Sequence, residues 1–247
     1  MDPKGKTALI TGGAIRLGQA ITLGLARAGA NVVINYYGSA PEAEETAAAA
    51  RARGVEALAL QADVADHAQV QKMVAQAEAH FGAVDILVNG ASLFKHTPVP
   101  TADVNDWQKV TAITIDGAFF CANAVAPKML EQGDGAIVNI VDLSAWEPWA
   151  GLAAHSVSKA ALLALTRQLA LDLAPAVRVN AVAPGLILPP PGYEAAQIER
   201  MAQGTFLKRW GTPADVVEAV LFLVRANYTT AECIRVDGGE RFGRRQR

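Results

Sequence analysis

The chain has 247 residues, of which 51% are hydrophobic and 19% charged, and its formal net charge is -2. This length is enough for one α/β domain with a well-buried core, and the hydrophobic content excludes intrinsic disorder. The balanced charge provides no global field that would attract nucleic acid or an anionic membrane, so neither is expected as a partner. One basic run, the tail with Arg241, Arg244, Arg245 and Arg247, is interpreted as a solvated end.

Cysteine content and segment hydrophobicity indicate a cytoplasmic protein. The two cysteines, Cys121 and Cys233, form neither a disulfide framework nor a metal-ligand cluster, which fits a reducing compartment. The first residues enter a strand without the pattern of a signal peptide. No segment approaches the roughly 20 unbroken apolar residues of a membrane span.

Short β-branched runs alternate along the chain with longer helical stretches rich in alanine and leucine. The predicted strands are Thr7–Thr11, Asn31–Asn35, Glu56–Gln61, Ile86–Asn89, Ala136–Val141, Val177–Val182 and Cys233–Val236. The predicted helices lie near 17–28, 41–53, 67–80, 104–131, 153–173 and 213–224. Several strands are almost wholly apolar, as parallel strands covered on both faces are. The alternation predicts a doubly wound, three-layer α/β fold with about seven parallel strands, as a single domain over residues 1–247.

Element ends are partly visible in the sequence. Thr212, Pro213 and Asp215 have the pattern of a helix start, and Gly29 and Gly54 are placed to cap helix ends. The least regular stretch is 184–210, with prolines at 189–191. It is interpreted as a mobile lid, with a rigid surface loop as the alternative.

The turn after the first strand is a candidate phosphate-binding loop. It carries Gly12 and Gly18 around Arg16 and Leu17, and a helix follows. Backbone N–H groups in such a turn can approach a pyrophosphate, and the helix N-terminus adds positive potential. An ordinary tight turn is the alternative, because a glycine turn alone is weak grounds for a cofactor.

The end of the second strand indicates which dinucleotide is bound. An acidic residue there would accept hydrogen bonds from the ribose 2′-OH and repel a 2′-phosphate. This chain has no acid in that stretch, which contains Asn35, Tyr36, Tyr37 and Ser39. Ser39 and Arg16 are able to contact a 2′-phosphate, so the sequence favours NADP(H) over NAD(H).

The order of these motifs resembles the short-chain dehydrogenase/reductase family over essentially the whole chain. The segment from Thr11 to Gly18 is similar to the Thr-Gly-x-x-x-Gly-x-Gly fingerprint, with Arg16 in place of the middle glycine, a variant seen in pteridine reductases. The resemblance implies that further residues border the cofactor. They are Asp63, Val64, Asn89, Gly90, Ala91, Ser92, Pro184 and Gly185.

The catalytic positions of that family are only partly retained. The family uses Tyr-x-x-x-Lys on a helix, and the lysine contacts the nicotinamide ribose and lowers the pKa of the tyrosine. Here Lys159 matches the lysine, His155 stands at the tyrosine, and Asp142 stands at the usual serine. Thr114 occupies the position of the usual asparagine. An aspartate at the serine position is again similar to pteridine reductases.

His155 and Asp142 replace the usual pair together, which suggests a shared role. A neutral imidazole is a very poor acid, but a carboxylate within about 4–6 Å stabilises imidazolium. The hypothesis is that protonated His155 is the general acid and that Asp142 supports its charge. The alternative is that His155 only fills the helix surface and that the protein binds a dinucleotide without turnover. No second His or Cys lies at ligand spacing from His155, so no metal site is expected.

The resemblance also implies a substrate pocket with aromatic walls. In pteridine reductases a Phe at the position of Phe94 stacks against the pterin, and Arg16, Ser92 and Asp142 take part in binding. Trp146 and Trp149 lie where the family lines its cleft. For Phe94 and these tryptophans, ordinary packing is the alternative.

These observations predict an NADPH-dependent oxidoreductase that is similar to pteridine reductases and acts on a C=N or C=O bond of a small, flat substrate. A 3-oxoacyl or general carbonyl reductase is the alternative within enzymes, and a catalytically silent NADP(H)-binding protein is the alternative outside them. The resemblance further implies a homotetramer.

Overall fold

The computed structural model describes residues 1–190 and 192–243. Pro191 lies outside the described residues, as do Arg244, Arg245 and Arg247, so the interpretations that involve these four residues are not addressed by the fold.

The centre of the molecule is a seven-stranded parallel sheet with the strand order β3-β2-β1-β4-β5-β6-β7. The strands are β1 (Thr7–Thr11), β2 (Asn31–Tyr36), β3 (Ala57–Gln61), β4 (Ile86–Asn89), β5 (Gly135–Ile140), β6 (Val177–Pro184) and β7 (Cys233–Val236). All residues of β1, β4 and β5 are buried, because helices cover both faces of the sheet. The predicted fold is therefore confirmed. The strand order reverses between β1 and β4, which opens a crevice at the carboxyl ends of these strands.

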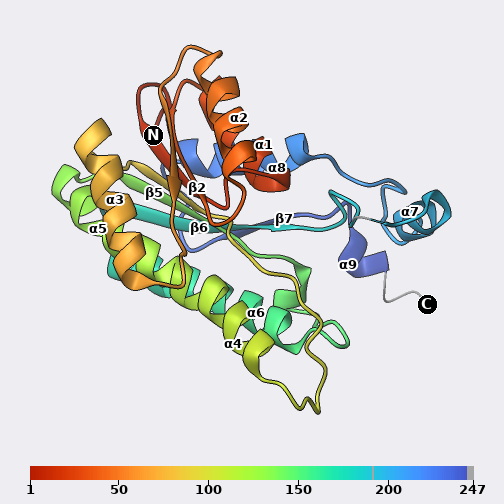
Figure 1. The fold of residues 1–247 in the computed structure, drawn as a ribbon. Coiled ribbons are helices and arrows are strands. Elements are labelled where there is room, and N and C mark those ends of the chain that lie inside the picture. The colour runs from red at the N-terminus through yellow and green to blue at the C-terminus, as the bar shows by residue number, and fades with distance from the viewer. Residues whose placement is uncertain (191, 244–247) are drawn as a thin grey trace.

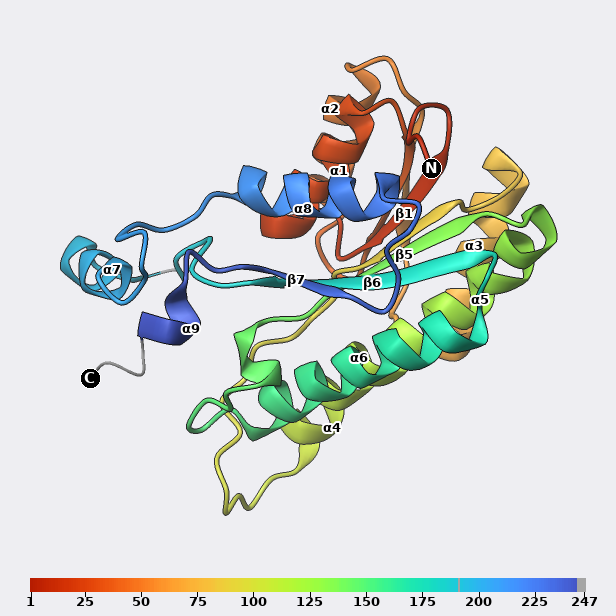
Figure 2. The ribbon, with the colours of Figure 1, turned by 180° about the vertical axis from the view of Figure 1, so that it is seen from behind.

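Helices form the two outer layers. They are α1 (Arg16–Arg27), α2 (Ala40–Arg51), α3 (His67–Phe81), α4 (Asn105–Thr111), α5 (Gly117–Gln132), α6 (Ala153–Asp172), α7 (Ala195–Ala202), α8 (Pro213–Arg225) and α9 (Glu240–Gly243). Figures 1 and 2 show α1, α2 and α8 on one face of the sheet and α3 to α6 on the other. α7 and α9 lie beyond the carboxyl ends of β6 and β7, and Met201 of α7 and Glu240 of α9 line a cavity there.

The sequence pattern placed most element ends within two residues. Thr212 and Asp215 form the expected capping box of α8, and Gly29 and Gly54 take positive φ angles of 90° and 84° after their helices. The predicted helix over 104–131 is divided by a π-helical segment, Ala112–Asp116, because one additional residue is accommodated there. The sequence prediction did not include α7, α9 or the 3₁₀ turn η2 (Leu143–Ala145), since helices this short leave little periodicity.

By length and composition alone, one helix of the described chain, Asn105–Gln132, is apolar enough to cross a membrane. Asp116 interrupts its apolar sequence, and Val125 and Met129 are buried in the core beneath the sheet. A buried core helix passes the same criterion, so the criterion is weak grounds for a membrane span.

Candidate active site

The turn after β1 is packed too tightly to accept side chains at Gly12 and Gly18. Thr11 Oγ1 accepts hydrogen bonds from the backbone N–H groups of Gly90 and Ala91 at 3.0 and 3.1 Å, which joins this turn to the end of β4. Gly12 has a φ of 64°, and a Cβ there would lie 3.1 Å from the Cα of Ala91. A Cβ on Gly18 would collide with the carbonyl oxygen of Gly12. Glycine is therefore required where the turn meets the helix.

The N-terminus of α1 fits a pyrophosphate. Its N-cap residue, Ile15, supplies no capping side chain, and the first turn contains no acidic residue. The first N–H groups of the helix therefore lack an acceptor within the helix, and they point outward with the positive end of the helix dipole. These features match the cofactor that the sequence predicts.

The end of β2 presents a polar, uncharged surface. Asn35 is 2% exposed, its Oδ1 accepts from Gly12 N at 3.3 Å, and its Nδ2 donates to Ala62 O at 3.0 Å. Asn35 thus fixes the glycine turn to the sheet. Tyr37 is 71% exposed, and Ser39 makes no capping hydrogen bond to the backbone of α2. No carboxylate of this segment would repel a 2′-phosphate.

Arg16 connects the turn with the segment after β6. Its backbone adopts a left-handed φ of 52°, which is uncommon for a residue with a side chain. Its Nη2 donates to the carbonyl oxygens of Leu188 and Pro189 at 3.4 and 3.3 Å. The guanidinium thus contacts the backbone near the start of the 184–210 segment.

The other residues expected to border the cofactor have different surroundings in the structure. Leu17 packs against the core below α1, and Val64 is 5% exposed. Asp63 accepts a hydrogen bond from Ala65 N at 2.9 Å, which shapes the turn after β3. Ser92 is exposed in the loop after β4. Pro184 ends β6, and Gly185 follows it at the wall of the crevice.

His155 and Asp142 form a close pair. Asp142 follows the carboxyl end of β5, and His155 lies in the first turn of α6. His155 Nε2 lies 2.5 Å from Asp142 Oδ2, and only 4% of the His155 surface is exposed. His155 Nδ1 has no hydrogen-bond partner among the residues that the structure describes. The pairing expected from the sequence is thus present in the geometry, and Nδ1 is left as the atom able to exchange a proton.

Lys159 lies one turn after His155 on α6. Its Nζ donates to the carbonyl oxygen of Ile140 at 2.8 Å, and burial lowers the pKa of Lys159 while the Asp142 carboxylate opposes that shift. Burial raises the pKa of Asp142, but hydrogen bonds from His155 and Ser144 together with the charge of Lys159 outweigh burial and hold this pKa below its usual value. Asp142 is therefore a carboxylate at neutral pH.

Two aromatic rings enclose His155. Trp149 is stacked with the imidazole at 5.8 Å between ring centroids, and Phe94 meets it edge-on at 4.8 Å. Phe94 is itself 60% exposed. His155 Nδ1 is buried in this arrangement.

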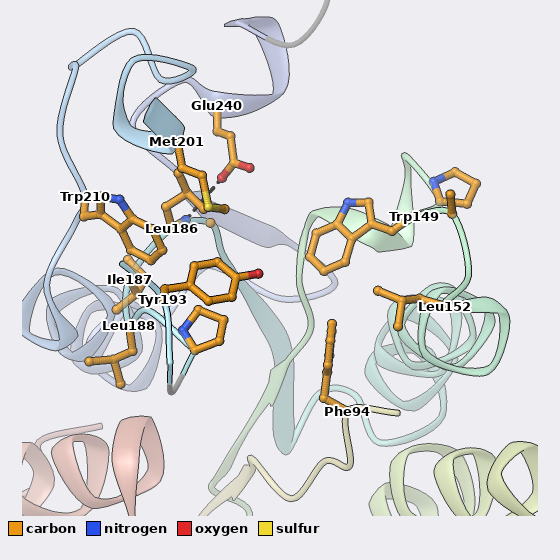
Figure 3. Close-up of a pocket in the computed structure, with 14 residues that line it drawn as sticks. Phe94, Trp149, Leu152, Leu186, Ile187, Leu188, Tyr193, Met201, Trp210 and Glu240 are labelled. Carbon is orange, nitrogen blue, oxygen red and sulfur yellow. Dashed lines mark hydrogen bonds between the residues drawn. The ribbon is translucent and has the colours of Figure 1, made fainter. Parts of the chain in front are cut away.

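A cavity of about 600 Å³ opens beside these rings (Figure 3). Phe94, Trp149 and Leu152 form one wall, and residues of the 184–210 segment form the other. The second wall contains Leu186, Ile187, Leu188, Tyr193, Met201 and Trp210. Most of this lining is apolar or aromatic, so the cavity suits a flat, largely uncharged molecule.

The structure places some predicted pocket residues elsewhere and adds others. Trp146 is not among the lining residues, and the guanidinium of Arg235 stacks on its ring at 4.0 Å. Tyr193 and Trp210 were missed because they come from irregular stretches, and Met201 was missed because it lies in the short helix α7, which the sequence analysis did not predict. Thr114, at the family's asparagine position, lies in the π-helical segment with its hydroxyl buried and without a partner in the described chain. The described residues contain no cluster of three His, Cys, Asp or Glu side chains able to hold a metal ion.

Comparisons with known proteins agree with this architecture. Residues 13–240 match the family model described as Enoyl-(Acyl carrier protein) reductase. The 3-oxoacyl-[acyl-carrier-protein] reductase FabG of Staphylococcus epidermidis is 36% identical over 239 residues, which are 95% of this chain and 98% of that protein. A gluconate 5-dehydrogenase from Burkholderia cenocepacia, solved in complex with NADP and tartrate, superimposes with a TM-score of 0.89 at 32% identity, covering 97% and 96% of the two chains.

A further structural relative, NAD+-bound xylitol dehydrogenase, has a TM-score of 0.90 at 29% identity and covers 97% of this chain and 100% of its own. These relatives match the chain over nearly its whole length. The protein therefore belongs to the short-chain dehydrogenase/reductase family and is an oxidoreductase of that type.

Proposed function

We propose that the protein is an NADPH-dependent reductase that acts on a carbonyl or imine carbon of a small, flat substrate, with the Asp142–His155 pair as its source of protons. The 2.5 Å contact between His155 Nε2 and Asp142 Oδ2 is the observation on which this proposal mainly rests. It connects the two unusual residues of the active site in one hydrogen bond and leaves His155 Nδ1 for the substrate.

NADPH would supply the hydride. The glycine turn and the N-terminus of α1 would hold its pyrophosphate, and Ser39 would contact the 2′-phosphate because no acid stands nearby. Lys159 would hold the nicotinamide ribose from its buried position on α6. Known relatives include both NADP and NAD complexes, so the preference for NADPH rests on this end of β2.

His155 would donate its Nδ1 proton to the oxygen or nitrogen that becomes basic as the substrate is reduced. The Asp142 carboxylate would stabilise the charged imidazolium, and Lys159 would oppose this effect by repulsion. The aromatic surroundings exclude water from the pair, which strengthens their interaction. The residues of the chain would thus position the imidazole, stabilise its charged form and shield its Nδ1 proton from water.

The substrate would be pterin-like or another flat heteroaromatic compound. Phe94 and Trp149 offer ring faces at the mouth of the cavity, and offset stacking contributes roughly 0.5–1.5 kcal/mol beyond buried area. Reduction of a 3-oxoacyl thioester is the second candidate, and it is favoured by the curated relatives at 36% identity. A silent NADP(H)-binding protein is the third, since the tyrosine position is His155.

The pH dependence of NADPH oxidation tests the role of the pair. In the wild type, kcat/KM should fall with rising pH on the limb where His155 loses its proton. In Asp142→Asn that limb should move about one pH unit or more toward acid, because imidazolium loses its carboxylate. Activity with an unchanged limb in Asp142→Asn would rule out the pair as the proton source.

Substrate panels separate the three candidates. Dihydrobiopterin, biopterin and acetoacetyl thioesters would be compared by NADPH oxidation, with calorimetry of NADPH binding in parallel. Binding without oxidation of NADPH by any compound favours the silent binder. Turnover that rises in His155→Tyr would then show that the remainder of the site is competent for the family's reaction.

A further inference from the structure

Asp142 is held by a second residue besides His155. Ser144 donates two hydrogen bonds to Asp142 Oδ1, from its hydroxyl at 2.5 Å and from its backbone N–H at 2.8 Å. Oδ2 of the same carboxylate is thereby directed to His155 Nε2. Ser144 is 2% exposed and lies on the 3₁₀ turn η2, so its hydroxyl is fixed in this place.

We propose that Ser144 is a positioning residue that keeps the proton of the Asp142–His155 pair on the imidazole. This inference extends the proposed role of His155 as proton donor. The inference follows from the two hydrogen bonds that Ser144 donates to Asp142 Oδ1.

The physical argument concerns where the shared proton resides. A close pair of a carboxylate and an imidazole holds it either on Nε2, as an ion pair, or on Oδ2, as two neutral groups. In the neutral arrangement the Nδ1–H belongs to an uncharged imidazole, which is a very poor acid. Two donors on Oδ1 stabilise the carboxylate and thus favour the ion pair. Ser144 supplies both donors, and its hydroxyl is the one that mutation can remove.

The remaining charges around the pair do not replace this effect. Lys159 on α6 favours the carboxylate but disfavours imidazolium. From the loop after β4, Lys95 pairs with Asp106 at 3.9 Å and His96 lies beside Gly151. Arg235 on β7 is stacked on Trp146. Ser144 is therefore a neutral hydrogen-bond donor that favours the proton position on Nε2 over the one on Oδ2.

Nitrogen NMR of the imidazole ring tests the proposal on the intact protein without substrate. The chain has 4 histidines, and the signals of His155 would be assigned from their loss in His155→Tyr. In Ser144→Ala the loss of a donor on Oδ1 raises the proton affinity of the carboxylate, so the shared proton should move from Nε2 toward Oδ2. A hydrogen bond to a charged group is worth roughly 1.5–3 kcal/mol, so the ratio of the two proton positions should change about tenfold or more. The Nε2 signal, recorded in the state in which the pair holds its proton, should then shift toward that of an unprotonated ring nitrogen, whereas Ser144→Thr retains the hydroxyl and should give the wild-type signal.

Ser156→Ala is the matched control. Ser156 is also buried and follows His155, but its hydroxyl accepts a hydrogen bond from Trp149 N and does not contact Asp142. This variant should leave the Nε2 signal unchanged. Should Ser144→Ala fold poorly, Ser144→Cys, with its weaker donor, should move the Nε2 signal in the same direction by less. A wild-type Nε2 signal in the folded Ser144→Ala or Ser144→Cys protein would overturn the proposal.

The readout separates this inference from the proposed function. The Nε2 signal does not depend on a substrate, so it reports on Ser144 even if no carbonyl compound is turned over. Conversely, a shifted Nε2 signal in Ser144→Ala together with an unchanged pH–rate limb in Asp142→Asn would reject His155 as the proton donor and retain Ser144 as the residue that orients Asp142.

Discussion

At the scale of single residues, a histidine and a tyrosine hold a transferable proton differently. A phenol with a pKa near 10 is protonated at neutral pH but gives up its proton reluctantly, so a neighbouring cation helps it. An imidazole, with a pKa near 6.5, is mostly neutral and needs a neighbouring anion to remain charged. Exchange of the tyrosine for His155 is therefore chemically matched by exchange of the serine for Asp142. One hydrogen bond joins the two replacing residues, His155 and Asp142.

The depressed pKa of Asp142 makes the stability of the protein depend on pH at this residue. A carboxyl group whose folded-state pKa lies below its unfolded value stabilises the fold above that value, here 3.8, and loses this contribution as the pH falls through the folded-state pKa. Asp142→Asn should lower the free energy of unfolding by about 1–3 kcal/mol near neutral pH. The difference from the wild type should shrink in acid.

Urea denaturation at several pH values measures this difference. Asp172→Asn, an exposed change at the end of α6, serves as the control and should stay within about 0.5 kcal/mol of the wild type throughout. A gap between Asp142→Asn and wild type that widens in acid would contradict the assigned direction of the pKa.

At the scale of elements, α6 depends on a residue far from it in sequence. Its N-cap residue, Leu152, makes no side-chain capping hydrogen bond. Thr97 takes this role from the loop that carries Phe94, because its Oγ1 accepts from Ala154 N at 3.0 Å. Thr97 N also donates to Gly151 O at 2.8 Å. The helix with His155 is thus fixed to the loop with Phe94.

Loss of the Thr97 hydroxyl should weaken this junction. Thr97→Val retains the shape of the side chain but leaves a buried N–H without its acceptor, at a cost of about 1–2 kcal/mol. For a chain of 247 residues this corresponds to a Tm lower by roughly 2–8 °C. Thr101→Val, in the same loop but exposed and bonded only to Asp103, should change Tm by about 2 °C at most. Equal losses in the two variants would argue against a capping role for Thr97.

The central strands β1, β4 and β5 were predictable because they are buried on both faces and are therefore largely apolar. The pairing of His155 with Asp142 was also predictable, since the spacing of the family motif places both at one site. The second wall of the cavity was not, because Tyr193 and Trp210 lie in irregular stretches on either side of the short helix α7, which carries Met201. The π-helical turn at Thr114 likewise left no sequence signal.

At the scale of the whole molecule, cofactor binding should stabilise the entire domain. A ligand at 100 times its Kd adds about 2.7 kcal/mol to the free energy of unfolding. This corresponds to a rise in Tm of roughly 5–11 °C for a domain of this size. NADPH should produce this rise at lower concentration than NADH, because no acid at the end of β2 repels its 2′-phosphate.

Calorimetric scans with each dinucleotide measure the effect. Ser39→Ala should weaken the effect of NADPH and leave that of NADH unchanged, since only the former has a phosphate for this hydroxyl to contact. Scans in which neither dinucleotide changes Tm would remove the basis for a cofactor in the crevice.

The facing walls of the cavity have a practical consequence. Trp149 lies on one wall and Trp210 on the other (Figure 3), and Trp210 Nε1 donates to Ile198 O at 2.9 Å, which ties its indole to α7. Indole fluorescence changes colour and intensity when water around the ring is displaced. A compound that fills the space between these walls should therefore alter the emission spectrum directly. Candidate ligands can be screened with this built-in optical probe before any reaction has been identified.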